Sequence, residues 1–189
     1  MDLPIDPTME ARLLEFYELA SARAKKKFGG ADEQWTLLRF EFRDDGPRMQ
    51  PDFSSKQYSI HLSQHAYTEW QQARPYTAAH EIGHEVIHTL APVTLSDDTN
   101  LEEGVATWFA NDFYEAVCKQ KSNHCGDSYR KQLGLVSRML RNNSSAIQKV
   151  RRTTPRFRDV TAEQLFALKA GLTRQECDYL VEPFPGREL

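Results

Sequence analysis

The stretch YTAAHEIGHEVIHTL, residues Tyr76–Leu90, determines how the rest of the chain is interpreted. It contains HEIGH at residues 80–84, which is an HExxH motif. Residues four apart lie on one face of a helix, so His80 and His84 can offer two imidazoles to one metal ion. Glu81 lies one position further round, where its carboxylate can reach a water on that metal. One helix thus supplies two ligands and a general base, as a hydrolytic zinc site requires.

The same stretch has the features of a helix. Its apolar residues recur at helical spacing, at Ala79, Ile82, Val86 and Leu90. Pro75 suits a first helical position, and Ala91-Pro92 is expected to end the helix. Gly83 weakens a helix by about 1 kcal/mol, which is useful where another backbone must come close. The competing interpretation is a surface helix whose histidines make ordinary hydrogen bonds.

A second segment, Leu101–Ala110, offers the ligand that two histidines lack. Hydrolytic zinc sites often take a glutamate as third protein ligand and leave the fourth position to water. Glu103 lies nineteen residues after His84, in a segment that reads as the next long helix. Glu102 is the alternative ligand. Either acid also favours the helix dipole at a first turn after Thr99 or Asn100.

The composition predicts an ordinary globular protein. The chain has 189 residues, 40% of them hydrophobic and 27% charged, and a net charge of −3. The charge gives no reason to expect nucleic acid or an anionic membrane as a partner. The acidic N-terminus and the odd number of cysteines favour a cytoplasmic location without disulfides. Cys118, His124 and Cys125 are a weaker candidate for a second metal site.

We expect a single domain over residues 1–189, in which residues 128–189 form a helical subdomain. Its predicted elements are helices at Tyr129–Arg141, Ala146–Arg152 and a helix–Gly–helix at Thr161–Leu180. Two capping boxes are expected there, one starting at Thr161 and one at Thr173. We interpret the basic cluster of Arg151, Arg152, Arg156 and Arg158 as a solvated loop.

The N-terminal half alternates between helix and strand. The pattern predicts a helix at Met9–Phe28, whose apolar face is Met9, Leu13, Phe16, Ala20 and Ala24. Strands are expected at Trp35–Arg43, with Leu38, Phe40 and Phe42 on one face, and at Gln57–Leu62. A short helix follows at 64–74. Either strand is a candidate for an open sheet edge that an extended substrate would join.

The motifs HEIGHEVIH and EEGVATWFA resemble those of ImmA/IrrE-type metallopeptidases, within the wider gluzincin class. The order of strand before metal helix and the small helical segment after it are also similar. The family commonly has E-A-N-x-F-A where this chain has E-E-G-V-A-T-W-F-A, a form closer to other gluzincins. The resemblance implies zinc bound by His80, His84 and Glu103, Glu81 as base, and a regulatory protein as possible substrate.

The sequence therefore predicts an α+β protein with a zincin-like core, in which a small sheet packs on the HExxH helix and the glutamate helix. The expected activity is that of a zinc-dependent endopeptidase acting on a protein or peptide. Asn111 or Asp112 is expected to orient a ligand histidine. The candidates for stabilising the oxyanion are Tyr114, His124, Tyr129 and Tyr179. A non-hydrolytic protein-binding regulator is the alternative function, and DNA binding through Thr161–Leu180 is disfavoured by the acidity of that segment.

Overall fold

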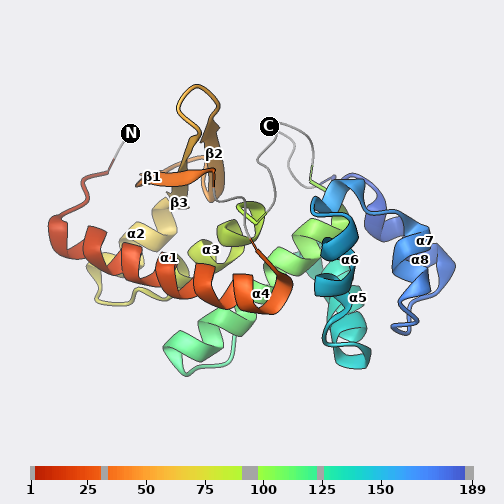
Figure 1. Cartoon of the computed structure of the whole chain (residues 1–189). Coiled ribbons are helices and arrows are strands. Elements are labelled where there is room, and N and C mark those ends of the chain that lie inside the picture. The colour runs from red at the N-terminus through yellow and green to blue at the C-terminus, as the bar shows by residue number, and fades with distance from the viewer. Residues whose placement is uncertain (1–2, 31–33, 91–97, 123–125, 186–189) are drawn as a thin grey trace.

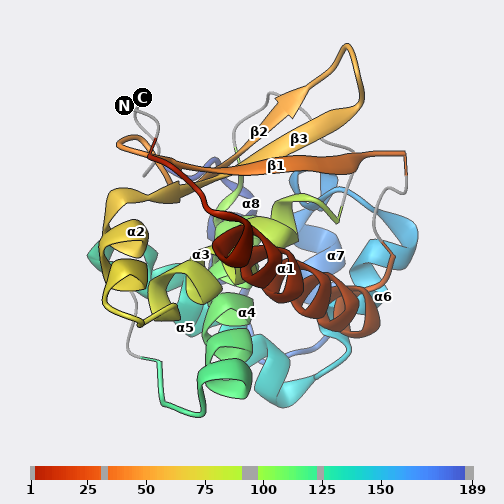
Figure 2. The same cartoon turned by 90° about the vertical axis from the view of Figure 1, so that its left-hand side faces the viewer.

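The computed structural model describes residues 3–30, 34–90, 98–122 and 126–185. These residues form eight α-helices and a three-stranded mixed sheet, which is an α+β fold as expected. Figure 2 shows the sheet across the top and the labelled helices beneath it, on the same side. None of the described helices combines the length and the apolarity that crossing a bilayer requires.

Helix α1, Pro7–Phe28, confirms the first predicted helix. The Asp6 side chain caps it by accepting from the backbone N–H groups of Thr8 and Met9. Gly29, at a φ of 95°, ends it in a conformation that favours glycine. The predicted apolar face is fully buried. Figure 1 shows α1 running across the molecule in front of α3 and α4, and α1 packs directly on α3.

The sheet has the order β1–β3–β2, with β1 at Thr36–Arg43, β2 at Arg48–Asp52 and β3 at Gln57–Ser63. Strand β3 pairs in parallel with β1 and antiparallel with β2. Of the two candidate edge strands, β3 is paired on both sides and is excluded, whereas β1 lies at an edge of the sheet. Sequence reasoning missed β2, in which Pro51 argues against a strand but is tolerated at a sheet edge.

One residue of β1 does not follow the predicted alternation. Leu38 was expected on the buried face with Phe40 and Phe42, but it is 46% exposed. The pairing of β1 with β3 shifts register between Leu37 and Arg39. A shift of one residue turns a side chain to the opposite face of the sheet. Phe40 and Phe42 lie beyond the irregularity and are buried as predicted.

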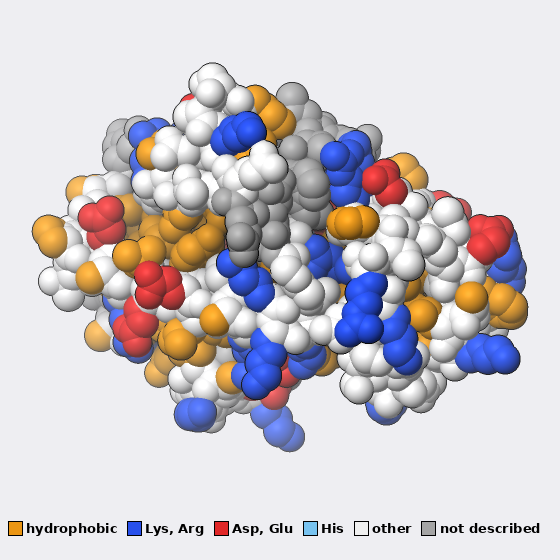
Figure 3. All heavy atoms as spheres, in the orientation of Figure 1, with side chains coloured by type: hydrophobic (Ala, Val, Ile, Leu, Met, Phe, Trp, Pro, Cys, Tyr) orange, Lys and Arg blue, Asp and Glu red, His pale blue; other side chains and the backbone are white. Residues whose placement is uncertain are grey.

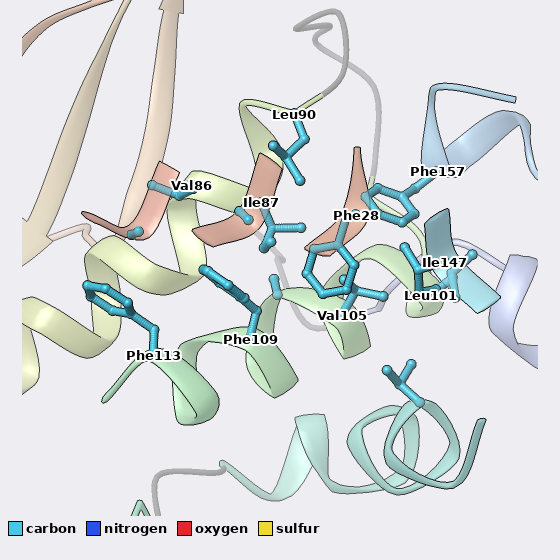
Figure 4. Close-up of a cluster of buried hydrophobic side chains, with 14 of the residues drawn as sticks. Phe28, Val86, Ile87, Leu90, Leu101, Val105, Phe109, Phe113, Ile147 and Phe157 are labelled. Carbon is cyan, nitrogen blue, oxygen red and sulfur yellow. The ribbon is translucent and has the colours of Figure 1, made fainter. Parts of the chain in front are cut away.

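Three helices follow the sheet and form the centre of the molecule. They are α2 at Gln64–Gln71, α3 at Tyr76–His88 and α4 at Asn100–Cys118. Helix α3 begins directly after Pro75. It ends at His88, two residues before Leu90, the last residue of the predicted stretch. The expected stop at Ala91-Pro92 lies outside the described residues. Figure 4 shows Val86 and Ile87 of α3 and Phe109 and Phe113 of α4 as members of one cluster of buried apolar side chains.

The described part of residues 128–189 is helical. It contains α5 at Arg130–Asn142, α6 at Ala146–Thr153, α7 at Ala162–Ala167 and α8 at Arg174–Val181, with short 3₁₀ turns at Asp127–Tyr129 and Phe157–Asp159. Both predicted capping boxes are present, between Thr161 and Gln164 and between Thr173 and Glu176. Local sequence therefore places these helix starts correctly.

Two arginines of this part, Arg138 and Arg174, are engaged with carboxylates. Arg174 of α8 pairs with Glu163 and Asp178, and Arg138 of α5 pairs with Glu176. On the face shown in Figure 3, Lys and Arg side chains lie in separate groups among neutral and acidic ones. Carboxylates of the α7–α8 pair thus neutralise its arginine, as expected for two helices that only pack against the rest of the protein.

Arg151 corrects the interpretation of the basic cluster as a solvated loop. This residue of α6 is buried, and its guanidinium donates to the backbone carbonyls of Phe28, Gly29, Gly30 and Pro155 at 3.1 to 3.2 Å. It also donates to the carbonyl of Leu90, two residues after the end of α3. Burial lowers the pKa of Arg151 to about 10, against the opposing effect of Glu102. The side chain therefore ties α6 to the ends of α1 and α3.

We expect Arg151→Ala to lower the free energy of unfolding by about 3 kcal/mol or more, because several buried carbonyls lose a charged donor at once. Arg152→Ala, at the exposed neighbouring position, is the matched control and should change it by less than about 0.5 kcal/mol. Urea denaturation followed by circular dichroism measures both. Equal small effects would mean that the carbonyls are satisfied without the guanidinium.

Candidate metal centre

Helix α3 carries the histidines of the motif along one side. His80, His84 and His88 follow one another at intervals of one turn. His80 is half-buried, whereas His84, His88 and the two glutamates of the helix, Glu81 and Glu85, are buried. The helix therefore runs from a partly accessible end at His80 to an enclosed end at His88.

Helix α4 lies against α3 because glycine lets the two backbones approach. A Cβ on Gly83 would lie 3.2 Å from the Cα of Ala110 and 3.1 Å from the Phe113 ring. The expectation that another backbone comes close at Gly83 is therefore confirmed. Thr99 caps α4 by accepting from the backbone N–H of Glu102, which fixes the first turn of the helix.

This packing places Glu103 beside the second histidine of the motif. The distance from His84 Nε2 to Glu103 Oε2 is 3.4 Å, and the Glu103 side chain is 0% exposed. Two ligands of a tetrahedral zinc ion are about 3.4 Å apart, given zinc–ligand bonds near 2.1 Å. Burial lowers the pKa of His84, but the carboxylates of Glu103 and Glu85 outweigh it and raise that pKa overall. The His84–Glu103 pair thus has the spacing and the charge environment of two ligands of one cation.

His80 has a different environment in this structure. Its Nε2 atom lies 3.2 Å from Asn111 Oδ1, and its ring meets Tyr114 edge-on at 6.4 Å. Asn111 thus contacts a predicted ligand histidine, whereas Asp112 pairs with Arg23 of α1 at 2.8 Å.

Among the described residues, two sets of three side chains bring ligand atoms within 4.8 Å of one another: His84, Glu85 and His88, and His88, Asp98 and Glu102. The predicted set of His80, His84 and Glu103 is not one of them. The structure brings His84 and Glu103 together and places His80 with Asn111.

Glu81 is held by Ser63, at the junction of β3 and α2. Its two carboxylate oxygens accept from the backbone N–H of Ser63 at 2.9 Å and from the Ser63 hydroxyl at 2.5 Å. Burial raises the pKa of Glu81 to about 7, and the bonds from Ser63 partly oppose this rise. A carboxylate with a pKa near 7 suits a general base at neutral pH. Sequence reasoning missed Ser63, whose only signal was its position before a helix, where serine is a common cap.

Two of the predicted oxyanion-stabilising residues flank the histidines. Tyr114 lies beside His80, and the Tyr129 ring meets the His84 ring at 6.0 Å. The Tyr179 hydroxyl instead donates to Gln132 at 3.2 Å. His124 lies outside the described residues, and so does the greater part of the weaker metal candidate formed by Cys118, His124 and Cys125.

The sequence contains a second HExxH motif that the first interpretation overlooked. Residues His84-Glu85-Val86-Ile87-His88 repeat the pattern and share His84 with the first motif. His88 lies two turns after His80, about 12 Å along the helix, which is too far for the two imidazoles to bind the same ion. His88 lies one turn after His84, just as His80 lies one turn before it. The ring centroids of His84 and His88 are 5.4 Å apart.

Comparisons with known proteins add nothing to this picture: no family model, no curated protein and no solved structure matches the chain. The resemblance to ImmA/IrrE-type metallopeptidases therefore stays a prediction from the motifs.

We expect Gly104→Ala to destabilise the protein by about 1 to 3 kcal/mol, since overpacking a core has costs of this size. Its new Cβ would lie 2.8 Å from Val136 and 3.0 Å from the carbonyl of Gln132, on α5. Gly134→Ala, where a Cβ meets nothing within 4 Å, is the matched control. It should stabilise by about 0.5 to 1 kcal/mol through helix propensity. Thermal melts of the two variants distinguish a packing requirement at α4 from a general intolerance of alanine.

Proposed function

We propose that the chain is a zinc-dependent endopeptidase with a zincin-like core. His84 and Glu103 would hold the ion, with His80 as the third ligand that the HExxH motif supplies. The single observation that carries this proposal is the 3.4 Å separation between His84 Nε2 on α3 and Glu103 Oε2 on α4. A zinc ion there would polarise the scissile carbonyl and lower the pKa of a water bound to it.

Glu81 is the residue proposed to move the proton. One carboxylate oxygen accepts a proton from the attacking water and returns it to the leaving amine. Ser63 fixes the position of this carboxylate, and burial brings its pKa to about 7, where both proton uptake and proton release are accessible. Tyr129 is the better placed candidate to donate to the oxyanion, because its partly exposed ring lies beside that of His84.

The substrate is proposed to bind as an added strand along β2. Strand β2 is an edge strand, and α3 packs against both β2 and β3. Pro51 pairs with Tyr58 and Met49 with Ile60. Because Pro51 has no N–H, we infer that it occupies a position whose backbone groups point away from β3, and alternation puts Met49 on the same outer edge. An extended peptide can then pair with Met49.

One observation favours the alternative of a non-hydrolytic regulator. Both oxygens of Glu81 accept from Ser63, so this carboxylate also links α3 to the end of β3. A protein that uses Glu81 only in this way would bind a partner without cleaving it. Substitution of Glu81 by glutamine distinguishes the two functions.

We expect Glu81→Gln to keep about one zinc per chain and to cleave peptides at least about 100-fold more slowly, the usual loss for a missing general base. Zinc is measured by elemental analysis, and cleavage by mass spectrometry on a library of unstructured peptides. Glu163→Gln, at an exposed position of α7, is the control. A zinc-loaded wild type that cleaves nothing would favour the binding protein, and cleavage retained by Glu81→Gln would exclude Glu81 as base.

We expect Met49→Pro to raise KM for peptides about five- to tenfold, because one hydrogen bond worth about 1 kcal/mol to an added strand is lost. Met49→Ala removes the side chain but keeps the N–H, and it should leave KM within about twofold. Steady-state kinetics on one cleaved peptide measure both. Equal effects of the two variants would show that the side chain matters and the strand edge does not.

A further inference from the structure

The second HExxH motif lies where both of its imidazoles are already oriented by carboxylates. Glu85 Oε1 lies 3.2 Å from His84 Nδ1, and Glu102 Oε1 lies 3.1 Å from His88 Nδ1. Asp98 adds a third oxygen, 3.6 Å from His88 Nδ1. Metal-binding histidines almost always donate one ring N–H to a carboxylate or carbonyl and bind the ion through the other nitrogen.

The remaining nitrogen of each ring faces the same carboxylate. Glu103 Oε2 lies 3.4 Å from His84 Nε2, and Glu103 Oε1 lies 4.0 Å from His88 Nε2. If each Nδ1 hydrogen is directed to its carboxylate, a neutral ring turns a lone pair toward the negative oxygens of Glu103. Two such lone pairs repel the carboxylate unless a proton or a metal ion lies between them.

The surroundings of the two imidazoles are rich in negative charge. Four carboxylates, those of Glu85, Asp98, Glu102 and Glu103, face two imidazoles, and Glu85 and Glu103 are 0% exposed. A cation between the two rings and Glu103 would be attracted by these carboxylates, and the attraction is stronger in the interior than at a surface.

We propose that His84, His88 and Glu103 form an inner position for a divalent ion of the zinc type, one helical turn from the outer position at His80. Two imidazoles and one carboxylate are the donors that zinc prefers. This inner position rests on the proposed function, because it uses His84 and Glu103 as the outer position does. Since these two ligands are shared, one ion can occupy only one of the two positions at a time. All three inner ligands are buried, as in a closed structural site, whereas His80 gives the outer position access to solvent.

The test is zinc binding by His80→Ala in the full chain, measured by chelator competition and by the rise in Tm on adding zinc. We expect about one zinc per chain in the wild type and in His80→Ala, and binding at least about 100-fold weaker in the His80→Ala/His88→Ala double variant. His65→Ala, at an exposed histidine of α2, is the control. Loss of zinc from His80→Ala to the level of the double variant would overturn the inner position.

A conservative variant tests the same site without emptying the core. Glu102→Gln in the His80→Ala background should weaken zinc binding about 10- to 100-fold, because His88 loses its orienting carboxylate. Unchanged affinity would overturn the inference. Failure of the proposed function is a separate result: a wild type that binds zinc but cleaves no peptide refutes the peptidase, whereas zinc held by His80→Ala still supports the inner position.

Discussion

The candidate centre depends on the close approach of α3 and α4. Gly83 lies between the two histidines of the first motif, and the absence of a side chain there lets Ala110 and Phe113 pack directly on α3. Glu103, two turns before Ala110 on α4, then reaches His84. A larger residue at 83 would push α4 outward and so lengthen the distance between Glu103 and His84. Packing of apolar residues thus determines the distance between two polar ones.

Burial gives this distance its chemical meaning. A carboxylate and an imidazole in contact at a protein surface contribute little, because water solvates both. Here Glu103 is fully buried, and the neighbouring carboxylates raise the pKa of His84 although burial alone would lower it. The enclosed end of α3 therefore has a high affinity for positive charge. Either protons on the histidines or a metal ion can supply that charge.

The sequence predicted those features that depend on local pattern. Periodicity and capping located α1, the capping boxes of α7 and α8, and the helix that carries the motif. Features that depend on distant partners were missed: Arg151 donates to the carbonyl of Phe28, 123 residues earlier, and Ser63 donates to the carboxylate of Glu81, 18 residues later. The second HExxH was readable from the sequence, yet its burial against Glu103 was not, because burial follows from how α3 and α4 pack.

The two motifs of α3 are suited to different roles because they lie at different depths. Glu81 adjoins the end of β3 through Ser63, on the side where α3 meets the sheet and an open strand edge. Glu85, one turn further, is 0% exposed and faces His84. A base has to reach a substrate, so in the proposed peptidase only the first motif would serve hydrolysis. The second motif is proposed to hold a cation at a buried position, and His84 and Glu103 would be shared by the two positions.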